Sequence, residues 1–492
     1  MSIPGPSSYR GSRGLVEGHL CAHTAGGFVR CGDYSNAHSV PASVLPAPSP
    51  GCCAHVKTGR TARIRPPKGL HSPPGLIHGG RHHLIPTEVS AMTSTPGSES
   101  NDRLSVVYSF PHALGAPGIG WTAWNQVVEL IAAGHRVHLV VASLARPVPG
   151  AAGVRRTLEL SGVRIPHRAL GRDRALARHD RIAAAVVRSV RPDVVHAWPL
   201  AARRTLAAAA GIGAAGLREA PNTHTAHAYR VVAEECARLG VVLPATASHA
   251  ENARHLAIEQ QEWDAATAVL VPSAPVEQSF LDRGHPAERL QRHRYGYRPG
   301  TTLPRTVPDD GPLTVLFLGR VEPRKGLHYA LEAWRDSTAA GEGRFLIFGD
   351  VVPSYGAFLA PLLDQPGVEL HPFTREPAAA LAAAHALVLP TIEEGSALVS
   401  YEAQAAGCIP LVSTAAGAVL EDGVHGLLHA PRDVDALRRQ FELLHERPAE
   451  RRRLAAAAAA HAPELSWAAA GVALVAAYRA ALRGVRADAV AR

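Results

Sequence analysis

Two glutamates in the second half of the chain have the spacing that points most directly to chemistry. Glu394 and Glu402 lie in the run TIEEGSALVSYEAQAAGCIP, with seven residues between them, directly after the apolar segment LVLP. Such a segment is typical of a buried parallel strand, Gly395 allows a tight turn, and Ser396 can cap a helix whose free N–H groups attract an anion. Because carboxylates only accept hydrogen bonds, they suit hydroxyl groups on either side of a bound phosphate. The pattern predicts a site for a nucleotide sugar.

A second cluster, about seventy residues upstream, supplies the positive charge that a diphosphate needs. The segment LTVLFLGRVEPRKG is another apolar strand, followed by Gly319 and a turn that carries Arg320, Arg324 and Lys325. A guanidinium offers a planar fork and an ammonium a movable point charge, so Arg320 and Lys325 together could neutralise a leaving group. Arg324 between them shows that not every cation of this turn need touch a ligand. The plain alternative is a solvated turn with surface charges.

Together these segments resemble the donor-site signature of the family 4 retaining glycosyltransferases, which have the GT-B fold. GRVEPRKG and EGSALVSYEAQAAG carry the resemblance, and PGIGW and RPDVVHAW, near the first strands, add to it. It covers roughly residues 104–480. The resemblance implies an α/β fold with two Rossmann-like doubly wound domains facing a cleft. It also implies transfer of a sugar from a nucleoside-diphosphate sugar, with no metal and no other cofactor.

The resemblance also implies a role for each site residue. The matching Arg and Lys bind the diphosphate, the first Glu the sugar hydroxyls, the second Glu the ribose, and a His of the other half the transferred sugar. Here those residues are Arg320, Lys325, Glu394, Glu402 and His224. Further donor contacts are expected from two glycine turns, from the helix start after Glu394 and from a strand end near the base: Gly118, Gly120, Gly319, Gly395, Ser396, Ala397, Leu398, Val399, Thr374 and Arg375. His196 of RPDVVHAW either lines the acceptor pocket or only packs.

Plainer roles for several of these residues stay open at this stage. Acidic residues near a helix start can simply cap it, an effect of about 0.3–1 kcal/mol. Glu393 stands beside Glu394 as a competing acid, and His227 could face the cleft in place of His224. The two histidines are disfavoured as zinc ligands because no third ligand is suggested.

The first 91 residues differ in kind from the rest of the chain. They are rich in Pro, Gly, Ser, His and Arg without a helix or strand period, and they hold nine Lys or Arg against three acids. We therefore predict that residues 1–103 are a disordered or mis-assigned extension. Because Met92 is the second of two methionines, we expect that the natural start is Met92. Cys21, Cys31, Cys52 and Cys53 lie in this segment at spacings that disfavour a zinc site.

From residue 104 onward, apolar strand-like segments alternate with helical ones, which predicts βαβ units and doubly wound sheets. The predicted division is an acceptor-binding domain over residues 104–300, a nucleotide-sugar donor domain over 301–464 and a helical tail over 465–492. A segment rich in Pro, Thr and Asp, RPGTTLPRTVPDDG, is expected to link the two halves.

The composition limits which other classes of protein the chain can belong to. With 46% hydrophobic and 19% charged residues, the chain can fill sizeable cores. Most of the formal charge of +9 comes from the first 91 residues, so nucleic-acid binding is disfavoured. Cys236 and Cys408 are too few for a disulfide framework, and no signal-peptide-like run opens the chain. A cytoplasmic location is expected, and contact with the inner face of a membrane is left open.

The predicted function is therefore sugar transfer, with retention of configuration, to an acceptor hydroxyl. The acceptor is expected to be a saccharide, a lipid-linked or a small molecule, and domain closure is expected to exclude water from the donor. Two rivals stay open. One is a nucleotide-sugar epimerase of the same fold, and the other is a non-catalytic protein that only binds nucleotide sugars.

Overall fold

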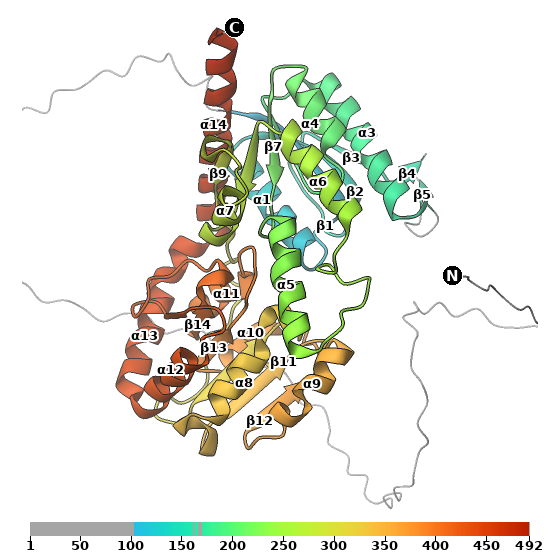
Figure 1. Ribbon diagram of the computed structural model, residues 1–492. Helices are drawn as coiled ribbons and strands as arrows, with labels where there is room; N and C mark the ends of the chain where they lie inside the picture. The colour runs from blue at the N-terminus through green and yellow to red at the C-terminus, as the bar shows by residue number, and fades with distance from the viewer. Residues whose placement is uncertain (1–102, 161–162, 166–169, 492) are drawn as a thin grey trace, which may run out of the picture. The chain divides into compact units, whose positions relative to one another are not determined.

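The computed structural model describes residues 103–160, 163–165 and 170–491 (Figure 1). The expectations for the extension, for the start at Met92 and for its four cysteines fall outside these residues. The described chain contains two parallel sheets with helices around them (Figure 1). We call the part from β1 to β9 the amino-terminal lobe and the part from β10 to β15 the carboxyl-terminal lobe.

The amino-terminal lobe is built on a seven-stranded parallel sheet in the order β3-β2-β1-β6-β7-β8-β9. Its central strands are almost wholly buried, which explains why they are continuous apolar runs. The strands are β1 (Ser105–Leu114), β2 (Arg136–Leu144), β3 (Gly153–Arg156), β6 (Val194–Ala197), β7 (Ala215–Glu219), β8 (Ala268–Val271) and β9 (Leu290–Arg292). Two short strands, β4 (Glu159–Leu160) and β5 (Val163–Arg164), form an antiparallel pair.

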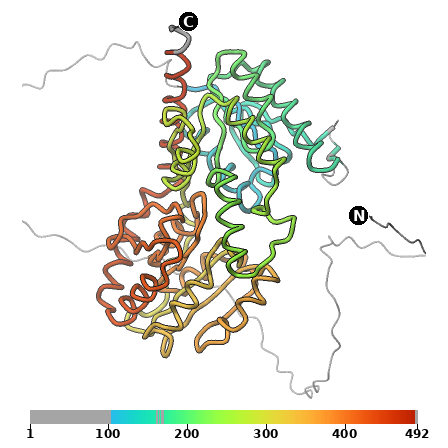
Figure 2. Tube along the Cα trace, viewed as in Figure 1, coloured from blue at the N-terminus to red at the C-terminus, as the bar shows by residue number. Residues whose placement is uncertain are grey.

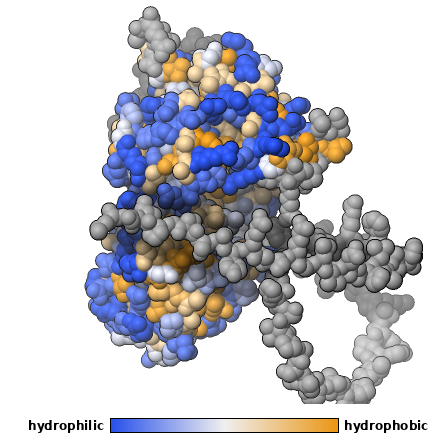
Figure 3. Space-filling view, turned by 45° about the vertical axis from the view of Figure 1, so that its right-hand side comes forward, coloured by the Kyte–Doolittle hydropathy of each residue, from blue (hydrophilic) through white to orange (hydrophobic). Residues whose placement is uncertain are grey.

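Helices connect these strands. They are α1 (Ile119–Ala132), α3 (Arg172–Val190), α4 (Arg203–Ala210), α5 (Thr225–Leu239), α6 (Ala253–Ala265), α7 (Ala274–Leu281) and the 3-10 turn η2 (Ala287–Arg289). Helix α3 buries an apolar stripe and exposes Arg174, Arg181 and Arg188. Figure 3 shows hydrophilic residues over much of the upper lobe on the face in view. The basic outer side of α3 was not anticipated from the sequence.

The carboxyl-terminal lobe is built on a six-stranded parallel sheet in the order β12-β11-β10-β13-β14-β15. Its strands are β10 (Thr314–Leu318), β11 (Arg344–Phe348), β12 (Val368–His371), β13 (Ala386–Leu389), β14 (Ile409–Ser413) and β15 (Leu427–His429). Its helices and 3-10 turns are η3 (Pro323–Lys325), α8 (Leu327–Arg335), η4 (Thr338–Gly341), α9 (Pro353–Leu363), α10 (Pro377–Ala382), α11 (Leu398–Ala406), η5 (Thr414–Ala416), α12 (Val434–Glu446), α13 (Pro448–His461) and η6 (Ala462–Leu465).

In both sheets the strand order reverses at one point, between β1 and β6 in the first and between β10 and β13 in the second. Ligands of doubly wound proteins bind beyond the carboxyl ends of the strands at such a point. The loops after β10 and β13 therefore meet there, although about seventy residues separate them in sequence. This topology is what positions the candidate site.

Two helices extend from one lobe to the other (Figure 2). The final helix α14 (Trp467–Ala491) follows the second sheet in sequence, yet Leu474, Val475 and Tyr478 belong to the core of the amino-terminal lobe. Helix α5 does the reverse, because Val231 packs in the core of the carboxyl-terminal lobe. Each lobe thus contributes a helix to the packing of the other.

Among the described residues, one helix has the length and composition to cross a membrane, over Trp467–Ala487 of α14. About 39% of its apolar window is buried. The side chains of Leu474 and Tyr478 lie in the protein core, so packing accounts for part of its apolar character.

Candidate functional site

The loops that follow β10 and β13 converge because these strands are hydrogen-bonded neighbours, with Val315 paired to Ala386 and Leu316 to Leu387. The first loop contains η3 and ends at Gly326, which adopts a left-handed backbone with φ of 67°. A Cβ atom at Gly326 would lie 2.2 Å from the carbonyl oxygen of Pro390, so only glycine allows the two loops to approach this closely.

Lys325 and Glu394 meet where these loops converge. The Lys325 ammonium donates a hydrogen bond to the Glu394 carboxylate, and Arg324 Nη1 lies 3.2 Å from the same oxygen. Burial by itself would raise the pKa of Glu394, but the charges of Arg324 and Lys325 outweigh it and lower the pKa to about 2. The carboxylate is therefore ionised at neutral pH and can accept hydrogen bonds from sugar hydroxyls.

Arg324, and not Arg320, is the arginine paired with this cluster. Arg324 makes ion pairs with Glu322 at 3.0 Å, with Glu394 at 3.2 Å and with Glu393 at 3.4 Å. Burial opposes its charge, yet these three carboxylates outweigh it and raise the pKa of Arg324 above its ordinary value. Arg320 has a half-exposed side chain whose Nε lies 3.7 Å from Glu322. The structure thus does not bring Arg320 into contact with Lys325 and Glu394.

Glu393, the competing acid, ties the two lobes together. It accepts a hydrogen bond of 2.6 Å from Thr223 Oγ1 of the amino-terminal lobe, and His249 Nε2 lies 3.3 Å away. Burial acts to raise its pKa, but His249, Arg324 and Thr223 outweigh burial, and the pKa of Glu393 is lowered. Its carboxylate is fully engaged in the protein, and of these two neighbouring acids Glu394 is the one that lines the cavity.

Backbone contacts between the lobes surround Gly395. A Cβ atom at Gly395 would lie 1.8 Å from the carbonyl oxygen of Pro221. Ser273 Oγ donates a hydrogen bond to the Gly395 carbonyl, and a Cβ atom at Gly417 would lie 2.4 Å from that same carbonyl. The glycine predicted to allow a tight turn therefore also allows the two lobes to touch.

Helix α11 begins one residue later than the sequence suggested. Its N-cap is Ala397, with no side-chain capping hydrogen bond, whereas Ser396 Oγ lies 2.5 Å from the Tyr401 hydroxyl. The prediction that Ser396 caps this helix was wrong, because Ser396 bonds to Tyr401 and to the Gly417 carbonyl instead. The first N–H groups of α11, at Leu398 and Val399, lack a capping side chain and suit an anion.

Glu402 lies on α11, one helical turn beyond these N–H groups. In the described part of the chain it has no hydrogen bond or ion pair. Burial raises the pKa of its carboxyl to about 7. An acid that is half-protonated near neutral pH and lacks a protein partner is suited to a polar ligand.

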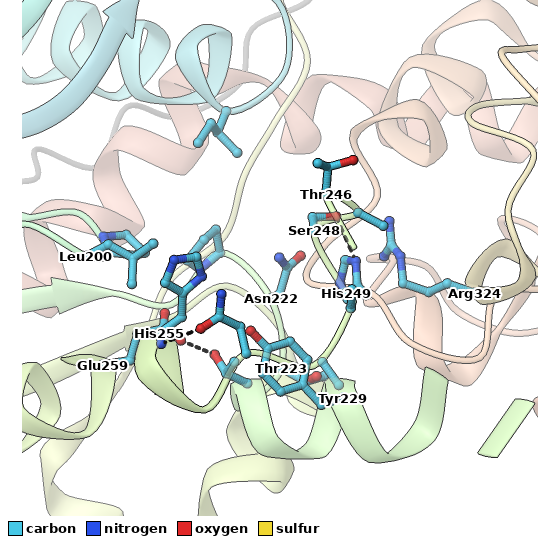
Figure 4. Close-up of a pocket in the computed structure, with 18 of the residues that line it drawn as sticks. Leu200, Asn222, Thr223, Tyr229, Thr246, Ser248, His249, His255, Glu259 and Arg324 are labelled. Carbon is cyan, nitrogen blue, oxygen red and sulfur yellow. Dashed lines mark hydrogen bonds between the residues drawn. The ribbon is translucent and has the colours of Figure 1, made fainter. Parts of the chain in front are cut away.

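A cavity of about 530 Å³ adjoins the cluster. Both lobes line it, with Arg324 and Glu394 on one side and most of the remaining residues from the amino-terminal lobe. In Figure 4, Asn222 lies between a group formed by His255 and Glu259 and a group formed by His249 and Arg324. The wall is rich in hydrogen-bonding side chains, which include His112, Asn222, Thr223, Tyr229, His249, Asn252 and His255.

His224 does not face this cavity. It caps α5, accepting a hydrogen bond from the Ala226 N–H at Nδ1, and its ring packs on Trp263 at 4.3 Å. Burial, assisted by Arg283 and by a neighbouring histidine, lowers the pKa of His224 to about 3. The expectation that His224 touches the transferred sugar is corrected, because the ring is held in an aromatic cluster.

His196 also belongs to the core. Its side chain is fully buried, with Nε2 3.0 Å from Glu219 and Nδ1 2.7 Å from the Tyr478 hydroxyl of α14. Of the two roles left open for His196, packing is therefore the observed one, and the acceptor-side assignment is corrected. Trp198, two residues on, lines the cavity and donates to the Tyr108 hydroxyl.

The remaining predicted residues follow strands β1 and β12. Gly118 is the N-cap of α1 with φ of 77°, and Gly120 packs so closely on Ala113 that a Cβ atom would lie 2.6 Å from its carbonyl oxygen. Thr374 follows edge strand β12 and accepts a hydrogen bond from the Glu376 N–H. Arg375 beside it is exposed.

Sequence reasoning missed most residues of the cavity, among them His249, Asn222 and Thr223. His249 lies in the segment between α5 and α6, which has no periodic pattern, and Asn222 and Thr223 precede α5. The polar run NTHT could have suggested a ligand loop, but nothing in the sequence of the second segment distinguishes His249. Among the described residues, no group of three or more His, Cys, Asp or Glu could hold a metal ion. Metal independence stays a prediction.

The two sheets, their strand orders and the cleft between them define the GT-B fold, and solved structures support this. Sucrose-phosphate synthase from Thermosynechococcus elongatus matches with a TM-score of 0.56 and 21% identity, covering 77% of this chain and 98% of that one. HepE of Anabaena in complex with UDP and glucose matches with a TM-score of 0.53 and 15% identity, and the match covers 76% of this chain and 98% of that one. The predicted fold is confirmed.

The sequence comparisons add a family match within the second half of the chain. Residues 312–447 match the family Glycosyl transferases group 1, so the carboxyl-terminal lobe carries a domain of that family and the inferred resemblance is confirmed. D-inositol 3-phosphate glycosyltransferase of Mycobacterium avium (strain 104) is 33% identical over 218 residues, 41% of this chain and 50% of that protein. Its counterpart in Mycolicibacterium smegmatis is 30% identical over 286 residues, which are 54% of this chain and 63% of that protein. The chain thus spans about half the length of the curated relatives it matches.

Proposed function

We propose that this protein is a retaining glycosyltransferase that moves a sugar from a nucleoside-diphosphate sugar to an acceptor hydroxyl. The observation that carries the proposal is the contact of Lys325 with Glu394 at the strand-order reversal of the second sheet, beside a cavity that both lobes line. The match of residues 312–447 to a glycosyltransferase family supports it.

In this proposal the donor lies along the loops after β10 and β13. The diphosphate contacts the first N–H groups of α11 at Leu398 and Val399, where the helix dipole favours negative charge. Lys325 supplies a mobile cation, and Arg320, half exposed and 3.7 Å from Glu322, turns from that acid toward the diphosphate when the donor binds. Preorganised cations of this kind stabilise the charge that grows on a departing diphosphate.

Two carboxylates then select the donor's hydroxyl groups. Glu394 is ionised, with a pKa of about 2, and accepts hydrogen bonds from the sugar. Glu402, with its pKa raised to about 7, accepts from the ribose or donates to it depending on pH. The departing phosphate takes the acceptor proton, so the bond from the anomeric carbon to phosphate breaks as the bond to the acceptor oxygen forms on the same face.

The acceptor occupies the amino-terminal side of the cavity. Its walls carry amide, hydroxyl and imidazole groups from Asn222, Tyr229 and His255, which suit a molecule with several hydroxyl groups. The matched relatives are named as acting on D-inositol 3-phosphate, which makes that compound the first acceptor to test. We propose that transfer takes place in the cytoplasm.

The test has two stages. A thermal-shift panel of uridine, guanosine and adenosine diphosphate sugars identifies the donor, because a ligand at 100 times its dissociation constant stabilises by roughly 2.7 kcal/mol. NMR of the reaction with that donor then identifies the product anomer. Retention supports the proposal. Inversion contradicts the mechanism, epimerised donor without acceptor supports the epimerase, and donor binding with no turnover on a broad acceptor panel supports a non-catalytic protein.

A further inference from the structure

A second cavity, of about 310 Å³, lies between the lobes on the side of β8 and β9. The amino-terminal lobe supplies Ser273 and the strand-end residues Arg292, His293 and Arg294. The carboxyl-terminal lobe supplies the region after β14, including Thr414. We call this the β9 cavity. The proposed sugar-transfer mechanism does not use it.

A wall of backbone separates the β9 cavity from the candidate active site. Ser273 Oγ bonds to the Gly395 carbonyl, and the Gly395 backbone packs directly on the Pro221 carbonyl. Gly417, which also lines the β9 cavity, approaches the same carbonyl of Gly395. A ligand in this cavity would therefore occupy a site of its own, not an extension of the donor site.

The charge of the β9 cavity is positive. Arg292 and Arg294 line it, and no Asp or Glu is found among the described residues of its lining. Arg292 is paired with Glu277 of α7. Within the described part of the chain, Arg294 makes no hydrogen bond or ion pair, and its Nε is buried without a partner. The guanidinium is thus a cation held at the cavity without a counter-charge.

His293 offers a second unsatisfied group at the same place. Its side chain is fully buried, with Nε2 3.0 Å from the Glu219 carboxylate, and its Nδ1 has no partner among the described residues. These two unpartnered nitrogens lie on adjacent residues of the cavity lining, where a ligand can meet them. A ligand group that satisfies Arg294 would have to accept hydrogen bonds.

We infer that the β9 cavity binds a small phosphorylated molecule, with its phosphate on Arg294. A guanidinium presents several N–H donors in a planar fork that matches phosphate oxygens, and Thr414 can add a hydroxyl from the opposite lobe. The volume exceeds what a phosphate alone fills, so the rest of the molecule has room. Since both lobes form the walls, the ligand favours the relative placement of the lobes seen here.

The probe for the test is inorganic phosphate, titrated at constant ionic strength by isothermal calorimetry. The reference is a Lys325→Ala variant, which removes the proposed donor-site cation so that phosphate bound there does not confuse the result. We expect saturable binding to Lys325→Ala, at least tenfold weaker binding when Arg294→Gln is added, and an intermediate affinity with Arg294→Lys.

Two results would overturn the inference. One is the absence of saturable binding in both the wild type and Lys325→Ala. The other is equal affinity with and without Arg294→Gln, provided that the variants unfold at the same temperature without phosphate. If Arg294→Gln does not fold, the comparison of Arg294→Lys with Thr414→Val decides, since both should weaken binding. The outcome is independent of whether the protein transfers a sugar.

Discussion

Replacing Gly395 by alanine tests whether the contact between the lobes sets the reaction geometry. The added Cβ atom would lie 1.8 Å from the Pro221 carbonyl oxygen and 2.7 Å from its carbon. Both contacts are to backbone, which cannot rotate away as a flexible side chain can. Because real Cβ contacts essentially never fall below 3.0 Å, the two loops must separate by at least about 1.2 Å.

This displacement acts directly across the site. Gly395 follows Glu394, and Pro221 precedes Asn222 and Thr223 on the acceptor side of the cavity. A misplacement of about 1 Å costs roughly 10²-fold in rate when two reactants must be held in line, so we expect turnover to fall by about that factor. Overpacking of this kind also destabilises by about 1–3 kcal/mol.

The assay is steady-state sugar transfer with the donor found in the thermal-shift panel, together with urea unfolding. Gly341→Ala is the matched control, because a Cβ atom at Gly341 meets nothing within 4 Å and the residue lies in the distant turn η4. We expect the control to keep full activity. If folded Gly395→Ala also turned over at the wild-type rate, the lobe contact would not set the geometry.

Four further predictions follow from the site and its supports. Lys325→Ala should lower turnover by about 10²–10³-fold, because a preorganised cation is lost. Donor binding is measured alongside by calorimetry, and an unchanged rate would exclude a role for Lys325 in stabilising the leaving diphosphate. Arg320→Ala should reduce turnover without changing the unfolding midpoint. Arg324→Ala should instead lower the unfolding free energy by about 3 kcal/mol, because buried carboxylates lose their partner. Thermal melts and kinetics on both variants separate these effects. For Glu402, the unfolded carboxyl ionises near pH 4.5 and the folded one near 7, so its contribution to the unfolding free energy should fall as pH rises through that window. The difference in unfolding free energy between the wild type and Glu402→Gln, from urea titrations at each pH, should therefore fall over this range, and a difference that does not change with pH would refute the raised pKa. Glu235→Gln should lower the free energy of unfolding, measured in urea, by about 3 kcal/mol. The reason is that the buried carboxylate accepts hydrogen bonds from residues of both lobes, namely Arg238, Arg432, His328 and Tyr329. A loss below about 0.5 kcal/mol would show that this cluster contributes little.

The sheets were predictable from sequence because buried parallel strands are continuous apolar runs. Segments such as LSVVYSF and TVLFLG have few other structural solutions, and they form β1 and β10. The crossing helices were not predictable in the same way. Helix α14 was recognised as a helix, but its packing on the first lobe depends on Tyr478 meeting His196, a contact across 282 residues of sequence.

Within the site, the sequence indicated which residues take part better than it indicated where their side chains point. Lys325 and Glu394 were expected at one ligand, and the structure brings them into contact. Arg320 and Arg324 lie four residues apart on an irregular turn, where no periodicity tells which one points at the acids. His224 was misjudged because a cap and an aromatic cluster hold its ring away from the cavity, information that lies in tertiary contacts with Trp263.

The most direct test of the central claim is a crystal structure of the protein with the nucleoside diphosphate of its preferred donor. We expect the diphosphate to lie on the N–H groups of Leu398 and Val399 within hydrogen-bond reach of Lys325, with the ribose at Glu402. A nucleotide bound in another place, with Lys325 and Glu402 out of contact, would contradict that claim.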